Sequence, residues 1–154
     1  MDNMEKRVGS NMGGVLAYWF VLVSDVLVVT KSSIGASVTL KDGCVWSEGV
    51  GTRDSIGYKE PGEPTGAGTV YKAELVAMVP QEGLNELLFE RMRHGRYLVR
   101  YKNAQGLEKL VGTMDEPLNF SEALDTKQVV TGLAGSGVRF WGDMTKKAVL
   151  YISG

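Results

Sequence analysis

Residues Tyr97–Gly112, YLVRYKNAQGLEKLVG, decide the fold because they contain both strands and the turn of a β-hairpin. Tyr97, Val99 and Tyr101 take every second position, which is the period of a half-buried strand. Asn103–Gly106 is a polar turn ending in glycine, and the return strand LEKLV follows it. Because an isolated hairpin is only marginally stable in water, one face must pack on something larger. We expect the face that carries the tyrosines to do so.

An amphipathic helix is expected directly before this hairpin, over about residues 82–94. Its positions at helical spacing form one stripe that can pack on a sheet. The stripe comprises Leu84, Leu87, Leu88, Arg91 and Met92. His94 lies in the last turn, where a cation complements the helix dipole. Gly95 follows at the position of a left-handed C-terminal cap.

The segment Thr69–Val79, TVYKAELVAMV, predicts a strand with one uniformly apolar face. That face, which we expect to enter the core, comprises Tyr71, Ala73, Leu75, Ala77 and Val79. Pro80 ends the strand because proline cannot donate to the ladder. Ala36–Leu40 alternates in the same way. The Asp-Gly turn after it predicts a hairpin whose return strand begins at Cys44–Trp46.

Further short strands are expected at regular intervals towards the end of the chain. They cover Leu118–Leu124, Gln128–Leu133, Val138–Gly142 and Ala148–Ile152, with Gly135–Gly137 and Asp143–Lys146 as turns. Many short strands separated by turn residues are typical of all-β architectures. The sequence therefore predicts a mainly β (α+β) fold, either a β-sandwich or a partly open barrel of antiparallel strands with a lone helix.

Composition indicates one domain preceded by an arm. The chain has 154 residues, of which 44% are hydrophobic and 23% charged, as in globular proteins. We assign residues 1–14 to a polar N-terminal arm and residues 15–154 to a single β-rich domain. Val15–Val29, VLAYWFVLVSDVLVV, is interpreted as two buried strands broken at Ser24-Asp25. An export segment is the alternative for this stretch, whereas it is too short and too interrupted to span a membrane.

The residues show no constellation for catalysis or metal binding. His94 is the only histidine and Cys44 the only cysteine, which leaves neither a histidine-based triad nor a cysteine zinc cluster. A net charge of −1 does not favour nucleic acid or an anionic membrane. The nearest basic-aromatic segment, RHGRYLVRYK (residues 93–102), is expected to turn its tyrosines inward. We therefore predict a protein that is not an enzyme and has no cofactor, metal, nucleic-acid partner or membrane span.

Thr52–Gly68, TRDSIGYKEPGEPTGAG, is the longest stretch without periodicity and is expected to form a loop. Pro61 and Pro64 exclude a helix or a central strand there. Long loops in compact domains are uncommon and are often functional or mobile. The candidate interface residues of this loop are Tyr58, Lys59, Glu60, Pro61, Glu63 and Pro64.

The order of these features resembles the small tail-associated structural proteins of prophages in gut bacteria. The matching segments are VTLKDGCVW, GTVYKAELVAMVP, YLVRYKNAQGLEKLVGT with EPLNF after it, and GVRFWGDMTKKAVLYISG. They cover roughly residues 34–154, whereas Val15–Thr30 is less clearly matched. The resemblance implies a non-catalytic virion component, similar to tail-tube or tail-completion subunits and assembled in the host cytoplasm. Its implied partners are further copies of itself, in a ring or tube, and other tail proteins.

Two other functional classes stay open. A monomeric β-sandwich that binds carbohydrate or peptide would use a concave surface lined by Trp46, Tyr58 or Trp141. A small enzyme on a β-barrel is the third class. A ring or higher oligomer would favour assembly, whereas a strict monomer would favour the binding module.

Overall fold

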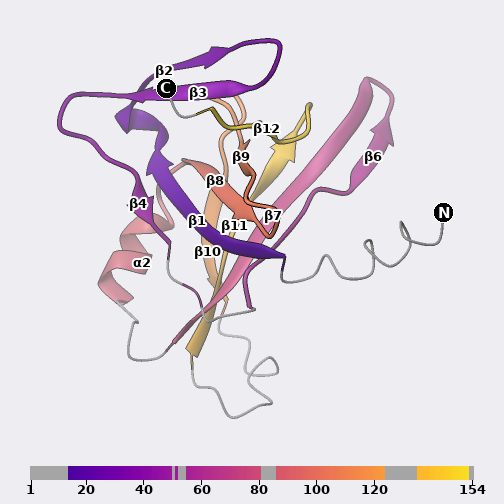
Figure 1. Ribbon diagram of the computed structural model, residues 1–154. Helices are drawn as coiled ribbons and strands as arrows, with labels where there is room; N and C mark the ends of the chain where they lie inside the picture. The colour runs from indigo at the N-terminus through magenta and orange to yellow at the C-terminus, as the bar shows by residue number, and fades with distance from the viewer. Residues whose placement is uncertain (1–13, 50, 52–54, 81–85, 124–134, 153–154) are drawn as a thin grey trace.

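The computed structural model describes residues 14–49, 51, 55–80, 86–123 and 135–152, which form two antiparallel sheets and a separate hairpin (Figure 1). The first sheet has the order β12 (Val149–Leu150), β9 (Glu108–Val111), β8 (Tyr97–Asn103), β1 (Val15–Leu22) and β4 (Ser47–Glu48). The second sheet comprises β10 (Asn119–Ala123), β11 (Gly135–Met144), β7 (Gly68–Pro80) and β5 (Gly57–Lys59), with β6 (Gly62–Thr65) also paired to β7. The hairpin is formed by β2 (Val26–Lys31) and β3 (Ala36–Leu40). The predicted mainly β, sandwich-like fold is confirmed, and the sheets do not close into a barrel.

The main core lies between the two sheets and is centred on an aromatic cluster. Phe140 of β11 is 1% exposed. Its ring centroid lies 5.2 Å from that of Phe20, 5.5 Å from that of Tyr97 and 5.1 Å from that of Phe120. Tilted and edge-to-face contacts of this kind stabilise a core beyond the area that they bury. Phe140 thus joins β1 and β8 of the first sheet to β10 and β11 of the second.

A second, smaller core lies on the other face of the first sheet, beneath the β2–β3 hairpin. Leu98 and Leu110 are buried there together with Val26 and Ala36 of the hairpin. Because side chains alternate along a strand, Leu98 enters this cluster while its neighbour Tyr97 enters the main core. The predicted strand pair over Tyr97–Gly112 and its inward tyrosine face are therefore confirmed. Both faces of β8 are covered.

The interpretation of Val15–Val29 as two strands is confirmed, but the second strand is not buried. A short 3-10 helix, η1 (Val23–Asp25), separates β1 from β2. Leu27 and Val28 of β2 are 62% and 46% exposed. Since only one face of the hairpin lies on the first sheet, its outer face is left in solvent.

The hairpin expected across the Asp42-Gly43 turn is wrong. Gly43 does adopt the positive φ of a turn, at 82°. The chain after it continues to β4, which pairs with β1 through Trp19 and Glu48. The antiparallel partner of β3 is β2, which precedes it along the chain.

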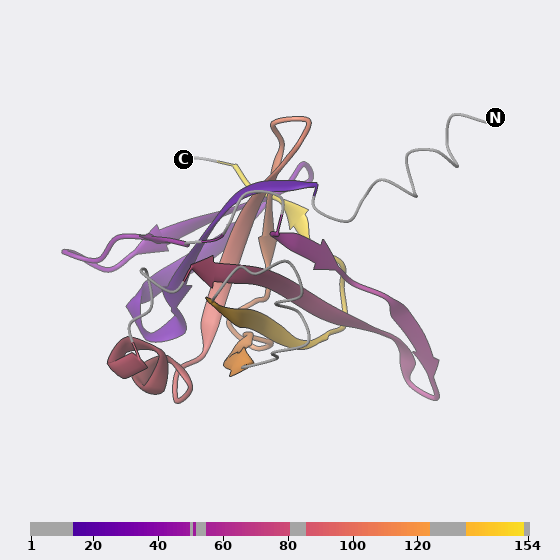
Figure 2. The ribbon, with the colours of Figure 1, turned by 90° about the horizontal axis from the view of Figure 1, so that it is seen from below.

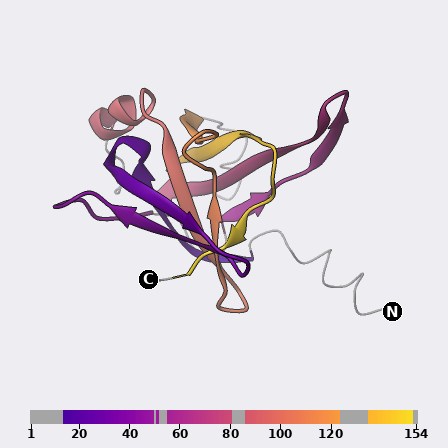
Figure 3. The same cartoon turned by 90° about the horizontal axis from the view of Figure 1, so that it is seen from above.

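Part of the loop expected at Thr52–Gly68 is strand. β5 and β6 pair with successive parts of β7, for example Tyr58 with Leu75 and Glu63 with Val70. Pro64 is tolerated because β6 has only one strand partner, so its missing N–H leaves no central ladder incomplete. The β6–β7 hairpin extends away from the body (Figures 2 and 3). Residues 52–54 lie outside the described part of the chain.

The helix α2 (Glu86–Met92) packs on β10 with a face that matches the predicted stripe at Met92 but not at Leu88 or Arg91. Phe89 and Met92 are buried, and the ring of Phe89 lies 5.8 Å from that of Phe120. Leu88, expected on the buried face, is 41% exposed. The expected start of the helix, with Leu84, falls on residues that the structure does not describe.

Gly95 does not adopt the left-handed conformation expected of a C-terminal cap, since its φ is not among the positive values of the described glycines. A Cβ at this position would lie 2.7 Å from Oη of Tyr97 and 2.8 Å from Cδ2 of Leu22. Glycine is therefore required here for close packing of the chain after α2 rather than for a turn.

The core face expected for β7 is confirmed except at Tyr71, which is only partly buried. The turn expected at Gly135–Gly137 is wrong, and of the turn expected at Asp143–Lys146 only Thr145 and Lys146 lie outside a strand. Ala73, Leu75, Ala77 and Val79 are each at most 3% exposed. The segment Gly135–Gly137 belongs to β11 and not to a turn, because it continues the ladder against the long partner β7. Asp143 and Met144 also belong to β11, again paired with β7. The strand expected at Gln128–Leu133 and the arm up to residue 13 lie outside the described residues.

Candidate functional site

Two of the predicted interface residues, Tyr58 and Glu60, contact other parts of the same chain and do not lie free at the surface. The ring centroid of Tyr58 lies 4.7 Å from that of Tyr101, and its hydroxyl donates a 2.9 Å hydrogen bond to Oε1 of Glu60. The same oxygen accepts a 3.2 Å bond from the backbone N–H of Ala148. Burial, and then the Glu60 carboxylate, raise the pKa of Tyr58 above its ordinary range. Glu60 thus fixes the connection between β11 and β12 to the edge of the second sheet.

The other predicted interface residues lie at the surface. Lys59 pairs with Glu74 at 3.3 Å, and Glu63 pairs with Lys72 at 3.8 Å. Pro61 and Pro64 are exposed along the edge formed by β5 and β6. Proline and charged residues at an edge oppose pairing with a further strand. This edge therefore suits contacts through side chains better than extension of the sheet.

The three aromatic residues considered for a ligand site lie in different places. Tyr58 is in the interior, whereas Trp46 lies beside Arg100, whose guanidinium also covers the rings of Trp19 and Tyr151. The carbon of that guanidinium lies 4.4 Å from the ring of Trp19, 4.9 Å from that of Trp46 and 4.8 Å from that of Tyr151. Trp141 lies on the outer face of the second sheet, 37% exposed. The structure brings none of these three candidates together.

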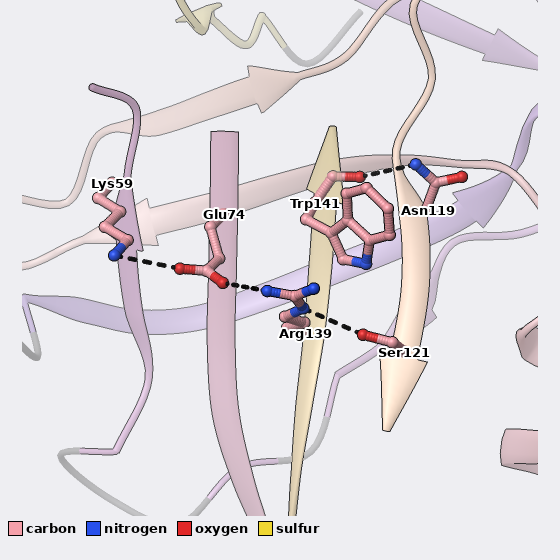
Figure 4. Close-up of polar contacts among 6 residues, drawn as sticks. All are labelled: Lys59, Glu74, Asn119, Ser121, Arg139 and Trp141. Carbon is pink, nitrogen blue, oxygen red and sulfur yellow. Dashed lines mark hydrogen bonds and ion pairs between the residues drawn. The ribbon is translucent and has the colours of Figure 1, made fainter. Parts of the chain in front are cut away.

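A line of polar contacts crosses the outer face of the second sheet (Figure 4). Glu74 accepts from Lys59 at 3.3 Å and from Arg139 at 2.9 Å. Arg139 also donates from Nε to Oγ of Ser121 at 3.1 Å. Burial opposes ionisation of Glu74, but the hydrogen bonds from the two cations outweigh it and lower its pKa. We call this row of Lys59, Glu74, Arg139 and Ser121 the surface ladder. Because its carboxylate is held in the ionised form between two cations, it has no proton to donate as a general acid.

Trp141 lies beside the surface ladder, and its side chain is partly exposed. The guanidinium of Arg139 lies 5.1 Å from the indole centroid, and Asn119 donates to the carbonyl of Trp141 at 3.3 Å. A hollow of about 410 Å³ lies here and extends to Asp143. Aromatic and polar groups together can orient a small ligand.

A basic groove lies between the β2–β3 turn and the connection from β11 to β12. We use this name for the groove of about 420 Å³ whose wall carries Lys31, Lys109, Lys146 and Lys147 around Ile34, Val149 and Leu150. None of its lining residues is an aspartate or glutamate. Glu116 holds the connection in place, since its Oε1 accepts from the N–H and hydroxyl of Thr145 at 2.9 and 3.0 Å.

An acidic end lies at the opposite end of the β2–β3 hairpin. This name covers Asp25 of η1 and Asp42 of the β3–β4 loop with the exposed apolar side chains of Leu27 and Val45, which are 62% and 77% exposed. The backbone N–H of Lys41 donates to the carbonyl of Asp25 at 2.9 Å, which ties η1 to the loop. Lys41 is the only cation in η1 and the loop, so these two segments together carry a net charge of −1.

Because no protein-family model, curated protein or solved structure matches the chain, the surfaces described above are the basis for proposing a function. Within the described residues, no cluster of three or more histidine, cysteine, aspartate or glutamate side chains could hold a metal ion. No helix in that same part is long and apolar enough to cross a membrane. Sequence reasoning missed the groove, whose lysines come from segments far apart in the chain.

Proposed function

We propose that the protein is a non-catalytic structural subunit of a phage or prophage tail that acts by self-association into a ring or tube. The main observation in favour of self-association is the exposed apolar surface of the β2–β3 hairpin and of the loop after it. Four of its large apolar side chains are between 46% and 77% exposed: Leu27, Val28, Ile34 and Val45. Exposed apolar groups gathered on one element mark interaction surfaces, because their burial in a contact is favourable.

The assignment to a tail is supported by the resemblance of residues 34–154 to tail-associated proteins and by the shape of the molecule. Two hairpins, β2–β3 and β6–β7, extend from the sandwich in different directions (Figure 1). Extensions of this kind let one subunit reach its neighbours on two sides. In this role the protein would be made in the host cytoplasm, would contact itself and other tail proteins, and would end in the virion.

The first test is the native mass of the purified chain by light scattering from about 1 to 100 μM. We expect a mass above that of the monomer which rises with concentration. Val45→Lys should lower it by placing a charge in the buried contact. Val76→Lys is the matched control, because Val76 is also exposed but lies on the second sheet. A strict monomer throughout this range would contradict self-association.

The tail assignment has its own test. Particles purified from cells that carry the intact prophage should contain this chain, as measured by mass spectrometry of density-gradient fractions. Its presence at a fixed ratio to other tail proteins is expected. Absence from intact particles would exclude the tail role and leave self-association to be judged separately.

A ligand-binding module is the second candidate, favoured by the exposed ring of Trp141 beside the hollow of the second sheet. Titration with soluble oligosaccharides would quench or shift tryptophan fluorescence if a ligand lies on this indole. Trp141→Ala should abolish that change, whereas Trp46→Ala should preserve it. The absence of any change across a glycan panel would remove the carbohydrate form of this candidate.

A further inference from the structure

The basic groove carries four lysines that form no ion pair within the described part of the molecule. Only Lys147 has an aromatic neighbour, with its Nζ 5.7 Å from the ring centroid of Tyr71. Like charges that share a concave wall raise the local positive potential and attract an anionic partner.

The same groove also offers apolar surface. Ile34 is 74% exposed, and Val149 and Leu150 are 37% and 40% exposed. A partner that fits therefore combines negative charge with apolar side chains. Such a combination is typical of a specific protein contact, with an apolar centre and a charged rim.

The acidic end of the β2–β3 hairpin has this complementary chemistry. Asp25 and Asp42 supply negative charge, and Leu27 and Val45 supply exposed apolar groups. The partial burial of Cys44, and then the Asp25 carboxylate, raise the pKa of the Cys44 thiol. The hydrogen bond from the backbone N–H of Lys41 to the carbonyl of Asp25 places Asp25 beside Asp42 at the same end of the hairpin.

The acidic end and the basic groove lie at opposite ends of one rigid hairpin. Lys31 pairs with Ala36 beside the groove, and Val26 pairs with Leu40 beside the acidic end. A rise of about 3.3 Å per residue separates the two ends by roughly 15 Å. Figure 1 shows the loop after β3 at one end of the hairpin and the β2–β3 turn at the other. The acidic end of a molecule therefore cannot fold back into its own groove.

We propose that the acidic end of one copy docks in the basic groove of the next copy. This inference rests on the proposed self-association and names the two surfaces through which it occurs. Because the two surfaces differ, the contact is heterologous and repeats from copy to copy, closing into a ring or continuing as a filament. Apolar side chains of both surfaces form its centre, and the lysine–aspartate pairs set its register.

The test is a charge swap between the two surfaces. The groove variant carries Lys146→Glu and Lys147→Glu, and the loop variant carries Asp25→Lys and Asp42→Lys. Each variant alone should assemble at least tenfold more weakly than wild type, because two of the four groove lysines, or both aspartates of the acidic end, are then replaced by groups that repel the facing surface. An equimolar mixture should assemble again, because the unchanged groove of the loop variant can bind the unchanged acidic end of the groove variant. Sedimentation velocity gives the masses.

The matched control reverses two exposed charges elsewhere. Glu90→Lys with Arg91→Glu on α2 should assemble as wild type does. Far-UV circular dichroism of every variant establishes that the sheets are intact, and the recovery on mixing shows that both variants are folded. High salt should weaken wild-type assembly, because screening reduces the attraction between exposed charges.

The outcomes separate this inference from the proposed function. If wild type assembles and the two variants assemble equally well, or if the mixture stays monomeric, the docking inference is overturned while self-association stands. If wild type is monomeric throughout, both are overturned. Binding of a single-stranded oligonucleotide or a polyglutamate peptide to that monomer, lost in the groove variant, would identify another occupant.

Discussion

The outer faces of the two sheets differ in what covers them. On the first sheet, the β2–β3 hairpin covers Leu98 and Leu110, which are 0% and 2% exposed. The outer face of the second sheet is open and carries Val76, Trp141 and the Glu74–Arg139 pair. In β8 the consecutive residues Tyr97, Leu98 and Val99 are all buried, whereas in β7 the exposed Val76 lies between the buried Leu75 and Ala77. The β2–β3 hairpin is therefore a structural layer on one face, while its other face leaves apolar side chains such as Leu27 exposed.

The largest expected difference between the two faces is in packing. Leu98→Ala should lower the free energy of unfolding by about 2–5 kcal/mol, because it leaves a cavity between two layers. Val76→Ala, on the open face, should change it by less than about 0.5 kcal/mol. Urea denaturation followed by tryptophan fluorescence measures both values. Equal effects of the two substitutions would show that the hairpin does not cover its sheet in solution.

A smaller difference is expected between the two arginines that contact tryptophan. Arg100 stacks on three rings and donates to Glu108 at 2.9 Å on the covered side, where 17% of its side chain is exposed. Arg100→Met should cost about 1–2 kcal/mol of unfolding free energy. Arg139→Met, on the open face with a side chain 43% exposed, should cost about 0.2–1 kcal/mol. Thermal and urea unfolding of both variants give the comparison, and a larger loss for Arg139→Met would reverse it.

The smallest expected effect concerns acid. The pKa of Glu74 in the folded protein lies below its ordinary value of 4.5. Its contribution to stability is therefore present above pH 4.5 and is lost as the pH falls through the lowered pKa. The difference in urea midpoint between wild type and Glu74→Gln should be visible at pH 7 and should shrink by pH 3. A difference that is independent of pH would contradict a role for the ionised carboxylate.

The parts of the fold that could be predicted from the sequence depend on local patterns. The core face of β7 follows from alternation within one strand, and the β8–β9 hairpin from alternation plus the turn at Asn103–Gly106. The break at η1 follows from Ser24-Asp25 between two apolar runs. Each of these signals is complete within a short segment, so no distant partner was needed to interpret it.

The remaining features depend on partners far away in the chain. β5 and β6 contain glycine and proline and form strands only because β7 pairs with them. β2 contains the apolar residues of a buried strand, yet it has only one covered side. The basic groove joins Lys31, Lys109 and Lys146 from three separate segments, and no spacing rule connects them. Tyr58 and Glu60 were predicted to lie at an interface, but they contact Tyr101 and Ala148 of the same chain. Because these partners are distant in sequence, the local pattern did not indicate the contacts.

The bridge between β3 and the residues that follow β12 has a consequence for the order of folding. Ala36 forms a parallel bridge with Tyr151, and its carbonyl accepts from the N–H of Ile152 at 2.8 Å. Pairings between residues so distant in sequence form late, because closing a long loop costs more entropy than closing a short one. The β2–β3 hairpin pairs residues close in sequence and can form early, but its bridge to Tyr151 forms only in the final stage. A chain stalled before that stage would leave Leu98 uncovered and prone to aggregate.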